Sequence, residues 1–144
     1  MNLEEFRLIE KKYRTLKPKI FALFEPDPAV NSSEINKVEA VTGLNLPIGY
    51  RNFVLNFGGG SYAFVHVFSL CPSSEFYLPI KVAEARSYGL PDDVIPFFDD
   101  YSGGYYCFQK NEERVSYWNQ LDGVNHTEYE DLFSFLARYA FEPA

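Results

Sequence analysis

Apolar residues recur at a spacing of three or four in several parts of the chain, and each such part predicts an amphipathic helix. The first covers residues 3–16, where Phe6, Ile9 and Tyr13 follow the helical period with charged residues between them. Asn2 precedes this segment and is a favoured N-cap residue, and Glu5 stands at the position that would complete a capping box with it. Residues 3–16 are therefore predicted to form a helix with one face turned toward the core.

Two further helices are predicted on either side of Gly43. The earlier one begins at Ser32 or Ser33, each of which could cap it. It ends at Gly43, because glycine enters the left-handed conformation without a Cβ penalty. The later helix covers residues 47–57 and opens with a proline, whose fixed φ suits a first helical turn. Gly58–Gly60 end this helix and lead into an extended run.

Short runs of aromatic and β-branched residues in the rest of the chain predict strands. A helix over residues 79–88 is inserted among them, and an apolar stripe over residues 128–141 predicts a closing helix. The connections between the last three strands are short, which favours an antiparallel meander. The predicted strands cover residues 62–70, 94–98, 104–108 and 115–119, with a short edge strand over 75–78.

This order of elements predicts an α+β fold. The fold has N-terminal helices, a central and mostly antiparallel sheet with one inserted helix, and a closing C-terminal helix. The chain has 144 residues, which is the length of one domain, and residues 1–144 contain no internal repeat or linker. Tyr50, Phe53 and Phe57 are predicted core residues that hold the sheet in place.

Charge is distributed unevenly along the chain, whose net charge is −7. Residues 1–24 hold six bases and three acids, whereas residues 92–131 hold ten acids and two bases. Nucleic-acid backbones select for clustered Lys and Arg, so this balance argues against a nucleic-acid partner. A basic protein would be drawn to the acidic half of the chain, although acidity can also serve only to keep a protein in solution.

The N-terminal residues lack the apolar segment of a signal peptide. No apolar run approaches the roughly 20 residues that a membrane-spanning helix needs. We therefore expect a cytoplasmic protein that has no membrane partner. Cys71 and Cys107 are then expected to be free thiols, because disulfides are rare in the cytosol.

Several residue groups that could suggest catalysis have simpler structural explanations. Gly58–Gly60 lack the lysine of a phosphate loop and follow a helix rather than a strand, so we expect them to end that helix and to allow close backbone packing. Asp92–Asp93 follow a proline, where turn or capping chemistry is expected. His66 and His126 have no Cys or Asp at ligand spacing, and Cys107 lies in an aromatic strand as a small apolar residue. We expect neither an enzyme nor a metal or other cofactor.

Tyrosines surround the acidic turns of the predicted sheet, and the chain holds 11 of them. Acidic and aromatic residues together suit a basic protein partner, because charge directs the approach and aromatic rings supply binding energy. We assign Trp118 to the core, because a lone tryptophan is usually largely buried. The predicted contact residues are Asp99, Asp100, Tyr101, Tyr105, Tyr117 and Glu112.

Five pieces of the sequence carry a resemblance to a known family through their order and spacing. They are Ser32/Ser33 to Glu39, Leu44-x-Leu46-Pro47-x-x-Tyr50-x-x-Phe53 with Gly58-Gly59, Val94-Ile95-Pro96-Phe97 running into Asp99–Gly104, the strand with Val115 and Trp118, and Phe133-x-Phe135-Leu136. Over about residues 30–140, this pattern resembles the SUKH superfamily, also called the Smi/Knr family.

The resemblance implies a compact α+β domain without enzymatic activity. Many bacterial members of the superfamily look like immunity proteins that bind and neutralise a polymorphic toxin, often a nuclease, encoded beside them. Fungal members act as regulators of cell-wall glucan synthesis. We therefore expect a protein-binding domain, monomeric or weakly dimeric, that neutralises a cognate toxin. A regulator or scaffold of cell-wall synthesis is the alternative, and an unrecognised hydrolase is a third hypothesis.

One departure from the family pattern concerns the turn of the sheet. Many members carry an acidic residue after the glycine of this turn, whereas this chain has Gly103-Gly104-Tyr105. If that acid takes part in binding, its role here passes to Asp99 or Asp100, or is absent.

Overall fold

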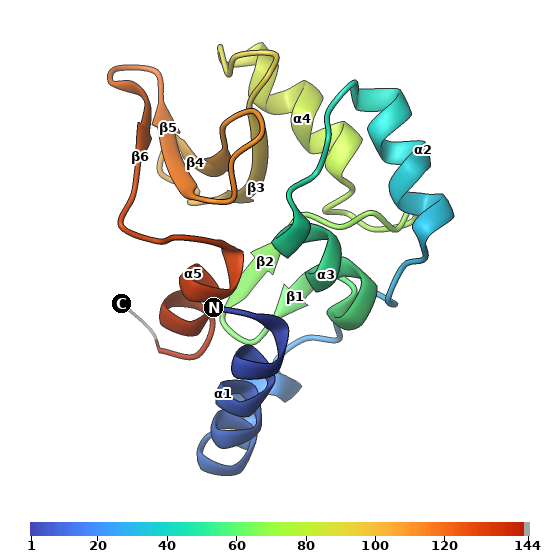
Figure 1. Ribbon diagram of the computed structural model, residues 1–144, viewed down its shortest axis with the longest axis vertical. Helices are drawn as coiled ribbons and strands as arrows, with labels where there is room; N and C mark the ends of the chain where they lie inside the picture. The colour runs from blue at the N-terminus through green and yellow to red at the C-terminus, as the bar shows by residue number, and fades with distance from the viewer. Residues whose placement is uncertain (143–144) are drawn as a thin grey trace.

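The computed structural model describes residues 1–142, which form an α+β fold as predicted (Figure 1). The helices are α1 (Leu3–Leu16), the 3-10 helix η1 (Pro18–Ala22), α2 (Ser32–Thr42), α3 (Ile48–Phe57), α4 (Leu78–Ser87) and α5 (Leu132–Tyr139). The strands are β1 (Gly60–Tyr62), β2 (Val65–Val67), β3 (Ile95–Asp99), β4 (Gly104–Phe108), β5 (Val115–Asn119) and β6 (Gly123–His126). In chain order, helices come first, the strands enclose α4, and α5 closes the fold.

Two antiparallel sheets replace the single central sheet that the sequence predicts. Strands β3, β4, β5 and β6 form a meander in that order, and β1 pairs with β2 in a separate hairpin. The register of β3 against β4 shifts between Pro96 and Phe98, so Pro96 lies at a bulge in an edge strand, where its missing N–H is tolerated. At the same bulge the carbonyl of Phe97 accepts a hydrogen bond of 2.8 Å from the Phe68 amide, which connects the two sheets.

The strand predicted over residues 62–70 is wrong, because the chain turns back within it. Ala63 has a φ of 49°, which an alanine rarely adopts, and no glycine marks this turn in the sequence. The Phe64 amide donates a 2.9 Å hydrogen bond to the carbonyl of Ala140, at the end of α5. A contact with a segment distant in sequence therefore holds the hairpin tip, which explains why local pattern does not predict it.

Three other elements differ from the predictions. The edge strand over residues 75–78 is wrong: this segment makes one isolated parallel bridge, between Ser69 and Tyr77. The closing helix begins at Leu132 instead of residue 128, because the Tyr129 carbonyl accepts a 3.0 Å hydrogen bond from the Val115 amide. That bond keeps the preceding residues extended beside β5. Strand β6 was not predicted, because its residues are mostly polar and it has no buried face.

The cap of α2 is Asn31 rather than Ser32 or Ser33. The Asn31 side chain accepts a 3.0 Å hydrogen bond from the Glu34 amide, and the Glu34 carboxylate accepts one of 3.2 Å from the Asn31 amide. This reciprocal pair is a capping box, and its Asn-x-x-Glu spacing was readable in the sequence. The capping box predicted between Asn2 and Glu5 at the start of α1 is confirmed.

The segment between α2 and β1 behaves as its glycines predict. Gly43 ends α2 in the left-handed conformation, with a φ of 72°. A Cβ at Gly58 would overlap the carbonyl of Asp27, so this glycine permits close backbone packing as well as ending α3. Tyr50 and Phe53 are fully buried as predicted, whereas Phe57 is half-buried against the core. The Tyr50 hydroxyl donates a 2.6 Å hydrogen bond to the Phe68 carbonyl, which satisfies its polar group.

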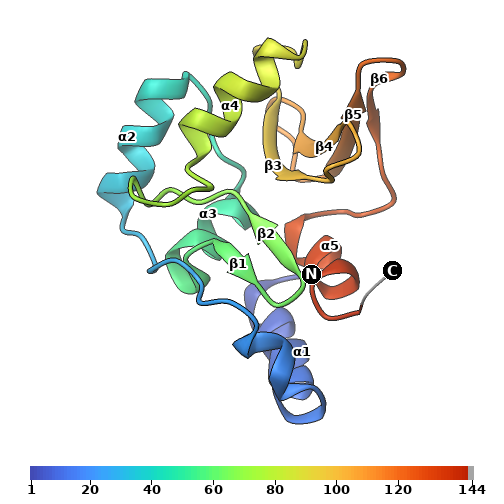
Figure 2. The same cartoon turned by 180° about the vertical axis from the view of Figure 1, so that it is seen from behind.

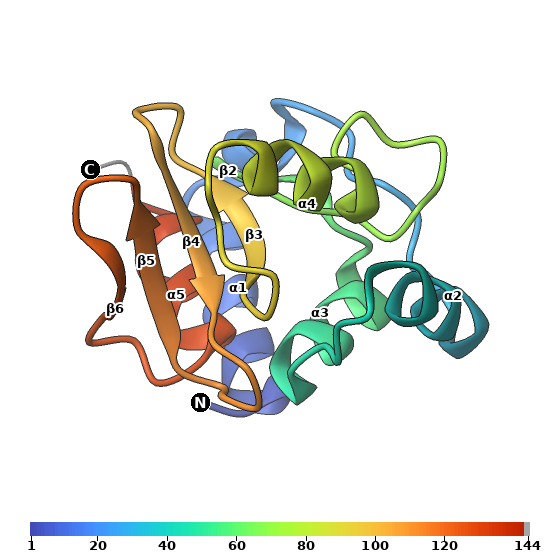
Figure 3. The ribbon, with the colours of Figure 1, turned by 90° about the horizontal axis from the view of Figure 1, so that it is seen from above.

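Helix α5 covers one face of the four-stranded sheet, as the view from above shows (Figure 3). Phe135 in this helix packs at ring distances of 5.2 Å from Phe97 and 4.8 Å from Tyr106. Helix α4 lies beside β3, on the other side of the sheet from α5 (Figure 3). Helix α1 packs at the end of the molecule farthest from α4, below the β1–β2 hairpin and against α5 (Figure 2).

Candidate partner-binding site

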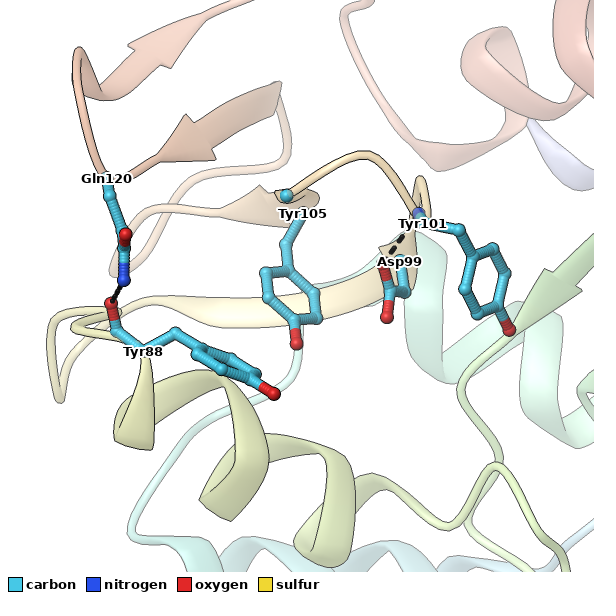
Figure 4. A pocket seen from close by; sticks show the side chains of 6 residues that line it. Tyr88, Asp99, Tyr101, Tyr105 and Gln120 are labelled. Carbon is cyan, nitrogen blue, oxygen red and sulfur yellow. Dashed lines mark hydrogen bonds between the residues drawn. The ribbon is translucent and has the colours of Figure 1, made fainter.

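A pocket of about 270 Å³ lies where the end of α4 meets two turns of the four-stranded sheet. One turn joins β3 to β4 and the other joins β5 to β6. Because successive strands from β3 to β6 run antiparallel, these two turns lie at the same end of the sheet. Three tyrosine rings and one carboxylate dominate its lining (Figure 4). The lining residues are Tyr88, Asp99, Tyr101, Gly103, Tyr105 and Gln120.

Asp100 holds the β3–β4 turn together and makes three hydrogen bonds. Its Oδ1 accepts from the amides of Ser102 and Gly104 at 2.8 and 2.9 Å. Its Oδ2 accepts from the hydroxyl of Tyr117 on β5. A Cβ on Gly104 would overlap this tyrosine hydroxyl. The Asp100 carboxylate is therefore committed to the local structure, and Gly104 leaves room for the bond to Tyr117.

Asp99 differs from its neighbour because it keeps one oxygen available. Its Oδ1 accepts a 2.7 Å hydrogen bond from the Tyr101 amide. Within residues 1–142 its Oδ2 accepts none. In Figure 4 the Asp99 side chain lies between those of Tyr105 and Tyr101. The Asp99 side chain is half-buried, and a carboxylate oxygen without a partner inside the protein can accept hydrogen bonds from a bound group.

Tyr101 occupies an unfavourable backbone conformation and is widely exposed. Its φ is 57°, in the left-handed region, and 67% of its surface is accessible. A residue other than glycine in this region costs on the order of 1–3 kcal/mol, and such outliers cluster at functional sites. The bond from its amide to Asp99 helps to hold this conformation. The strained turn thus presents an aromatic ring at the edge of the pocket.

Tyr105 forms the inner wall of the pocket and is only 5% exposed. Its ring lies 6.1 Å from that of Trp118 and 6.4 Å from that of Phe68. Burial, together with the nearby Asp99 carboxylate, raises the pKa of Tyr105 to about 12. Its hydroxyl therefore stays protonated near neutral pH, when it can both donate and accept hydrogen bonds.

Tyr88 and Gln120 complete the pocket and are the members that sequence reasoning missed. Tyr88 caps the C-terminal end of α4 and is 58% exposed. The Gln120 side-chain amide donates a 2.7 Å hydrogen bond to the Tyr88 carbonyl, which ties the β5–β6 turn to the end of α4. The two residues lie 32 positions apart in sequence, so no local motif could have indicated their meeting.

The six residues predicted to contact a partner separate into three places. Asp99, Tyr101 and Tyr105 come together in the pocket. Tyr117 pairs with Tyr106 at a ring distance of 4.9 Å and so lies on the face of the sheet that α5 covers, where it bonds Asp100. Glu112 lies at the opposite end of the sheet. The assignment of Trp118 to the core is confirmed, with 4% of its surface exposed.

Glu112 belongs to the β4–β5 connection and bonds the side chain of His126 at 2.6 Å. Residues 116 and 126 are paired across β5 and β6, which places this contact far from the β3–β4 turn. Both side chains remain partly exposed. Glu112 can therefore join the pocket residues in one interface only if a partner spans the length of the sheet.

The residues weighed for catalysis and metal binding lie in structural settings. Cys107 is buried, and burial raises the pKa of its thiol to about 12, so a reactive thiolate does not form near neutral pH. His66 stacks on Phe76 at 4.6 Å. Asp92 and Asp93 are exposed. In the part of the chain that the structure describes, no three His, Cys, Asp or Glu side chains converge as metal ligands do.

The family model SUKH_5, described as SMI1-KNR4 cell-wall, matches residues 11–141. The chain belongs to the SUKH_5 family. This match confirms the resemblance to the SUKH superfamily. None of the helices among residues 1–142 of this SUKH_5 domain has the length and apolar character needed to cross a membrane.

A crystal structure of a protein from Pseudomonas syringae pv. tomato is similar to this SUKH_5 domain, with a TM-score of 0.71. The two chains are 20% identical, and the similarity covers 91% of this chain and 98% of the other. At that identity the similarity shows the fold alone. No curated protein matches the chain.

The departure from the family pattern has a structural explanation in this SUKH_5 domain. Gly104 follows the turn glycine, and any side chain there would meet the Tyr117 hydroxyl. Tyr105 is the next residue and lines the pocket. The carboxylate that lines the pocket is that of Asp99, at the end of β3.

Proposed function

We propose that this SUKH_5 domain is a non-enzymatic immunity protein that binds a cognate basic toxin and neutralises it. The proposal rests chiefly on the pocket, which is lined by three tyrosine rings and by the carboxylate of Asp99, whose Oδ2 accepts no hydrogen bond within residues 1–142. Aromatic anchors beside a charged group are the usual composition of a strong protein contact. The domain would act by covering the toxin's active site or substrate groove.

The charge around the pocket supports a basic partner. Residues 92–131 carry ten acids and two bases, and this segment supplies both turns that border the pocket. Asp99 and Asp100 lie in one turn, and Asp122 lies beside Gln120 in the other. A concentrated negative field speeds the association of a positively charged protein, and this effect weakens as salt is added.

Growth rescue tests this proposal. The product of the adjacent reading frame is expressed in a sensitive host, alone and together with this protein. We expect growth to be restored by co-expression and the two proteins to co-purify. A double variant, Asp99→Asn with Tyr101→Ala, should lose most of the rescue while folding normally. Absence of both rescue and co-purification with the wild-type protein contradicts the toxin proposal.

A regulator of cell-wall synthesis is the second candidate function. The observation that favours it is the description of the matching family model, which refers to the cell wall. This function predicts several partners and no toxin beside the gene. Deletion of the gene would then alter cell-wall composition in cells that carry no cognate toxin, whereas an immunity protein would leave that composition unchanged.

A further inference from the structure

We propose that the pocket bordered by Tyr88, Asp99, Tyr101 and Tyr105 receives an arginine side chain of the protein partner. This inference rests on the proposed binding function and names the group that is bound. It follows from the available carboxylate oxygen, the tyrosine rings around it, and the excess of negative charge nearby.

The Asp99 carboxylate supplies the negative charge that would bind the arginine guanidinium. Its Oδ1 is held by the Tyr101 amide at 2.7 Å, so the side chain is oriented before anything binds. Its Oδ2 accepts no hydrogen bond from any group in residues 1–142. Charge-assisted hydrogen bonds from a guanidinium to a carboxylate are about twice as strong as neutral ones. An arginine N–H would therefore complete the bonding of Asp99.

The tyrosines favour arginine over lysine. A guanidinium is planar, stacks on aromatic faces and is weakly hydrated, whereas an ammonium ion is compact and strongly hydrated. Tyr88, Tyr101 and Tyr105 offer three rings from three different elements around one opening (Figure 4). Their hydroxyls can accept the guanidinium N–H groups that do not reach Asp99.

Negative charge outweighs positive charge around the pocket. Burial is the larger cause that raises the pKa of Tyr101 and that of Tyr105, and each pKa is raised further by three of four nearby carboxylates. Lys81 has the opposing effect on Tyr101, but its ammonium group lies 3.4 Å from Glu84 and over the Phe68 ring at 5.9 Å, so it already has partners. The four carboxylates belong to Asp99, Asp100, Glu75 and Glu84.

The size of the pocket also suits one side chain. Sites for drug-sized ligands usually measure roughly 300–1,000 Å³, and this pocket measures about 270 Å³ and is open to solvent. It can admit a single long side chain from a protein surface while Tyr101 and Tyr88, both widely exposed, contact the surrounding surface of the partner.

An NMR titration of the isolated protein tests the proposal without a toxin. The probes are the N-acetyl amides of arginine, lysine and citrulline, the last being a neutral analogue of arginine. We expect the arginine probe to shift the amide signals of Tyr101, Gly103 and Gln120 in a saturable manner, with a Kd in the millimolar range. The lysine probe should bind at least about fivefold more weakly, because it cannot stack. The citrulline probe should cause no comparable shifts.

Two variants locate the binding. Asp99→Asn keeps the oxygen that accepts from the Tyr101 amide but removes the charge, and it should weaken the arginine probe by about tenfold. Tyr88→Ala should weaken it by about threefold. The control, Glu25→Gln, removes one charge at an exposed position outside the pocket and should leave the affinity unchanged.

The outcomes separate this inference from the proposed function. No saturable shift at probe concentrations on the order of tens of millimolar, equal binding of citrulline, or an unaffected Asp99→Asn variant each overturns the arginine pocket. If growth rescue succeeds while the arginine probe fails, the binding function stands and the pocket assignment falls. If the arginine probe binds as described while rescue fails, the pocket assignment stands and the toxin proposal falls.

Discussion

Asp99 and Asp100 are adjacent acids at the end of one strand, yet their surroundings give them different roles. Asp100 accepts three hydrogen bonds, two from backbone amides and one from the Tyr117 hydroxyl. Asp99 accepts one, from the Tyr101 amide. Adjacent side chains of an extended segment point in opposite directions, which separates the two carboxylates. Asp100 therefore stabilises the turn, and Asp99 is left to bind.

This difference predicts unequal effects of two substitutions on stability. Asp100→Ala removes the acceptor of three hydrogen bonds in a partly buried turn, and it should lower the free energy of unfolding by about 2 kcal/mol. Asp99→Asn keeps its single acceptor and should change that free energy by less than about 0.5 kcal/mol. Urea unfolding measures both. Equal effects of the two substitutions would show that the hydrogen bonds of Asp100 do not hold the turn.

Helix α2 shows how the choice among neighbouring polar residues is made. Asn31, Ser32 and Ser33 are all favoured N-cap residues, but only one residue can precede the first helical turn. The side chain of Glu34 returns to the Asn31 amide at 3.2 Å and completes a capping box. The helix therefore begins at Ser32, and its cap is the residue three positions before the glutamate.

Substitutions at the start of α2 test this assignment. Asn31→Ala leaves the Glu34 amide without its side-chain acceptor and should lower the free energy of unfolding by about 1 kcal/mol. Ser32→Ala, one position later, removes an exposed hydroxyl and should cost less than about 0.5 kcal/mol. Chemical denaturation of the two variants provides the measurement. A larger loss of stability in the serine variant would show that Ser32, one of the two serines that the sequence suggested, is the cap.

The molecule as a whole is built around aromatic residues, and several of its tyrosines are buried. Burial raises the pKa of Tyr50 and Tyr62 above the ordinary value of 10.0, and that of Tyr105 to about 12. These phenols stay protonated in the folded protein at pH values where the unfolded chain has already ionised them. Folding and tyrosine ionisation are therefore coupled in alkaline solution.

This coupling predicts the direction of the pH dependence. The unfolded chain releases phenolic protons near pH 10.0, before the folded protein does. Stability is therefore fully present below that pH and falls as the pH rises toward about 12. Each buried tyrosine steepens the fall by at most about 1.4 kcal/mol per pH unit.

Urea unfolding at a series of alkaline pH values measures this fall, with tyrosinate absorbance recorded in parallel. We expect most of the tyrosinate signal to appear together with loss of structure, and Tyr50→Phe to make the fall shallower. Complete tyrosine ionisation near pH 10 with the fold intact would contradict the prediction.

Much of the fold was readable from local pattern. The helical period located α1 and α3, a leading proline and a following glycine located α4, and the meander β3–β5 followed from strand-like runs joined by short turns. The glycines of residues 43–60 were correctly assigned to ending helices and close packing. These features depend on residues near one another in the chain, so periodicity and turn chemistry are sufficient to indicate them.

Of the candidate site, the sequence indicated Asp99, Tyr101 and Tyr105, because acidic and aromatic residues gather at one predicted turn. It could not tell Asp99 from Asp100, since their difference comes from the hydroxyl of Tyr117 on another strand. Nor could it bring Tyr88 to Gln120. Both of these depend on contacts between distant segments. The position of Glu112 at the far end of the sheet, in contrast, already follows from the predicted meander, in which it lies between the second and third strands.

Local pattern therefore determined most of the helices and the strands β3–β5, since an amphipathic element is defined by its own repeat. Tertiary structure decided the hairpin at Ala63, held by the Ala140 carbonyl, and the late start of α5. It also decided which acid faces the pocket. Packing sets these features, because an unfavourable φ persists only where the surrounding structure holds it in place, and because the Tyr117 hydroxyl that occupies Asp100 comes from another strand.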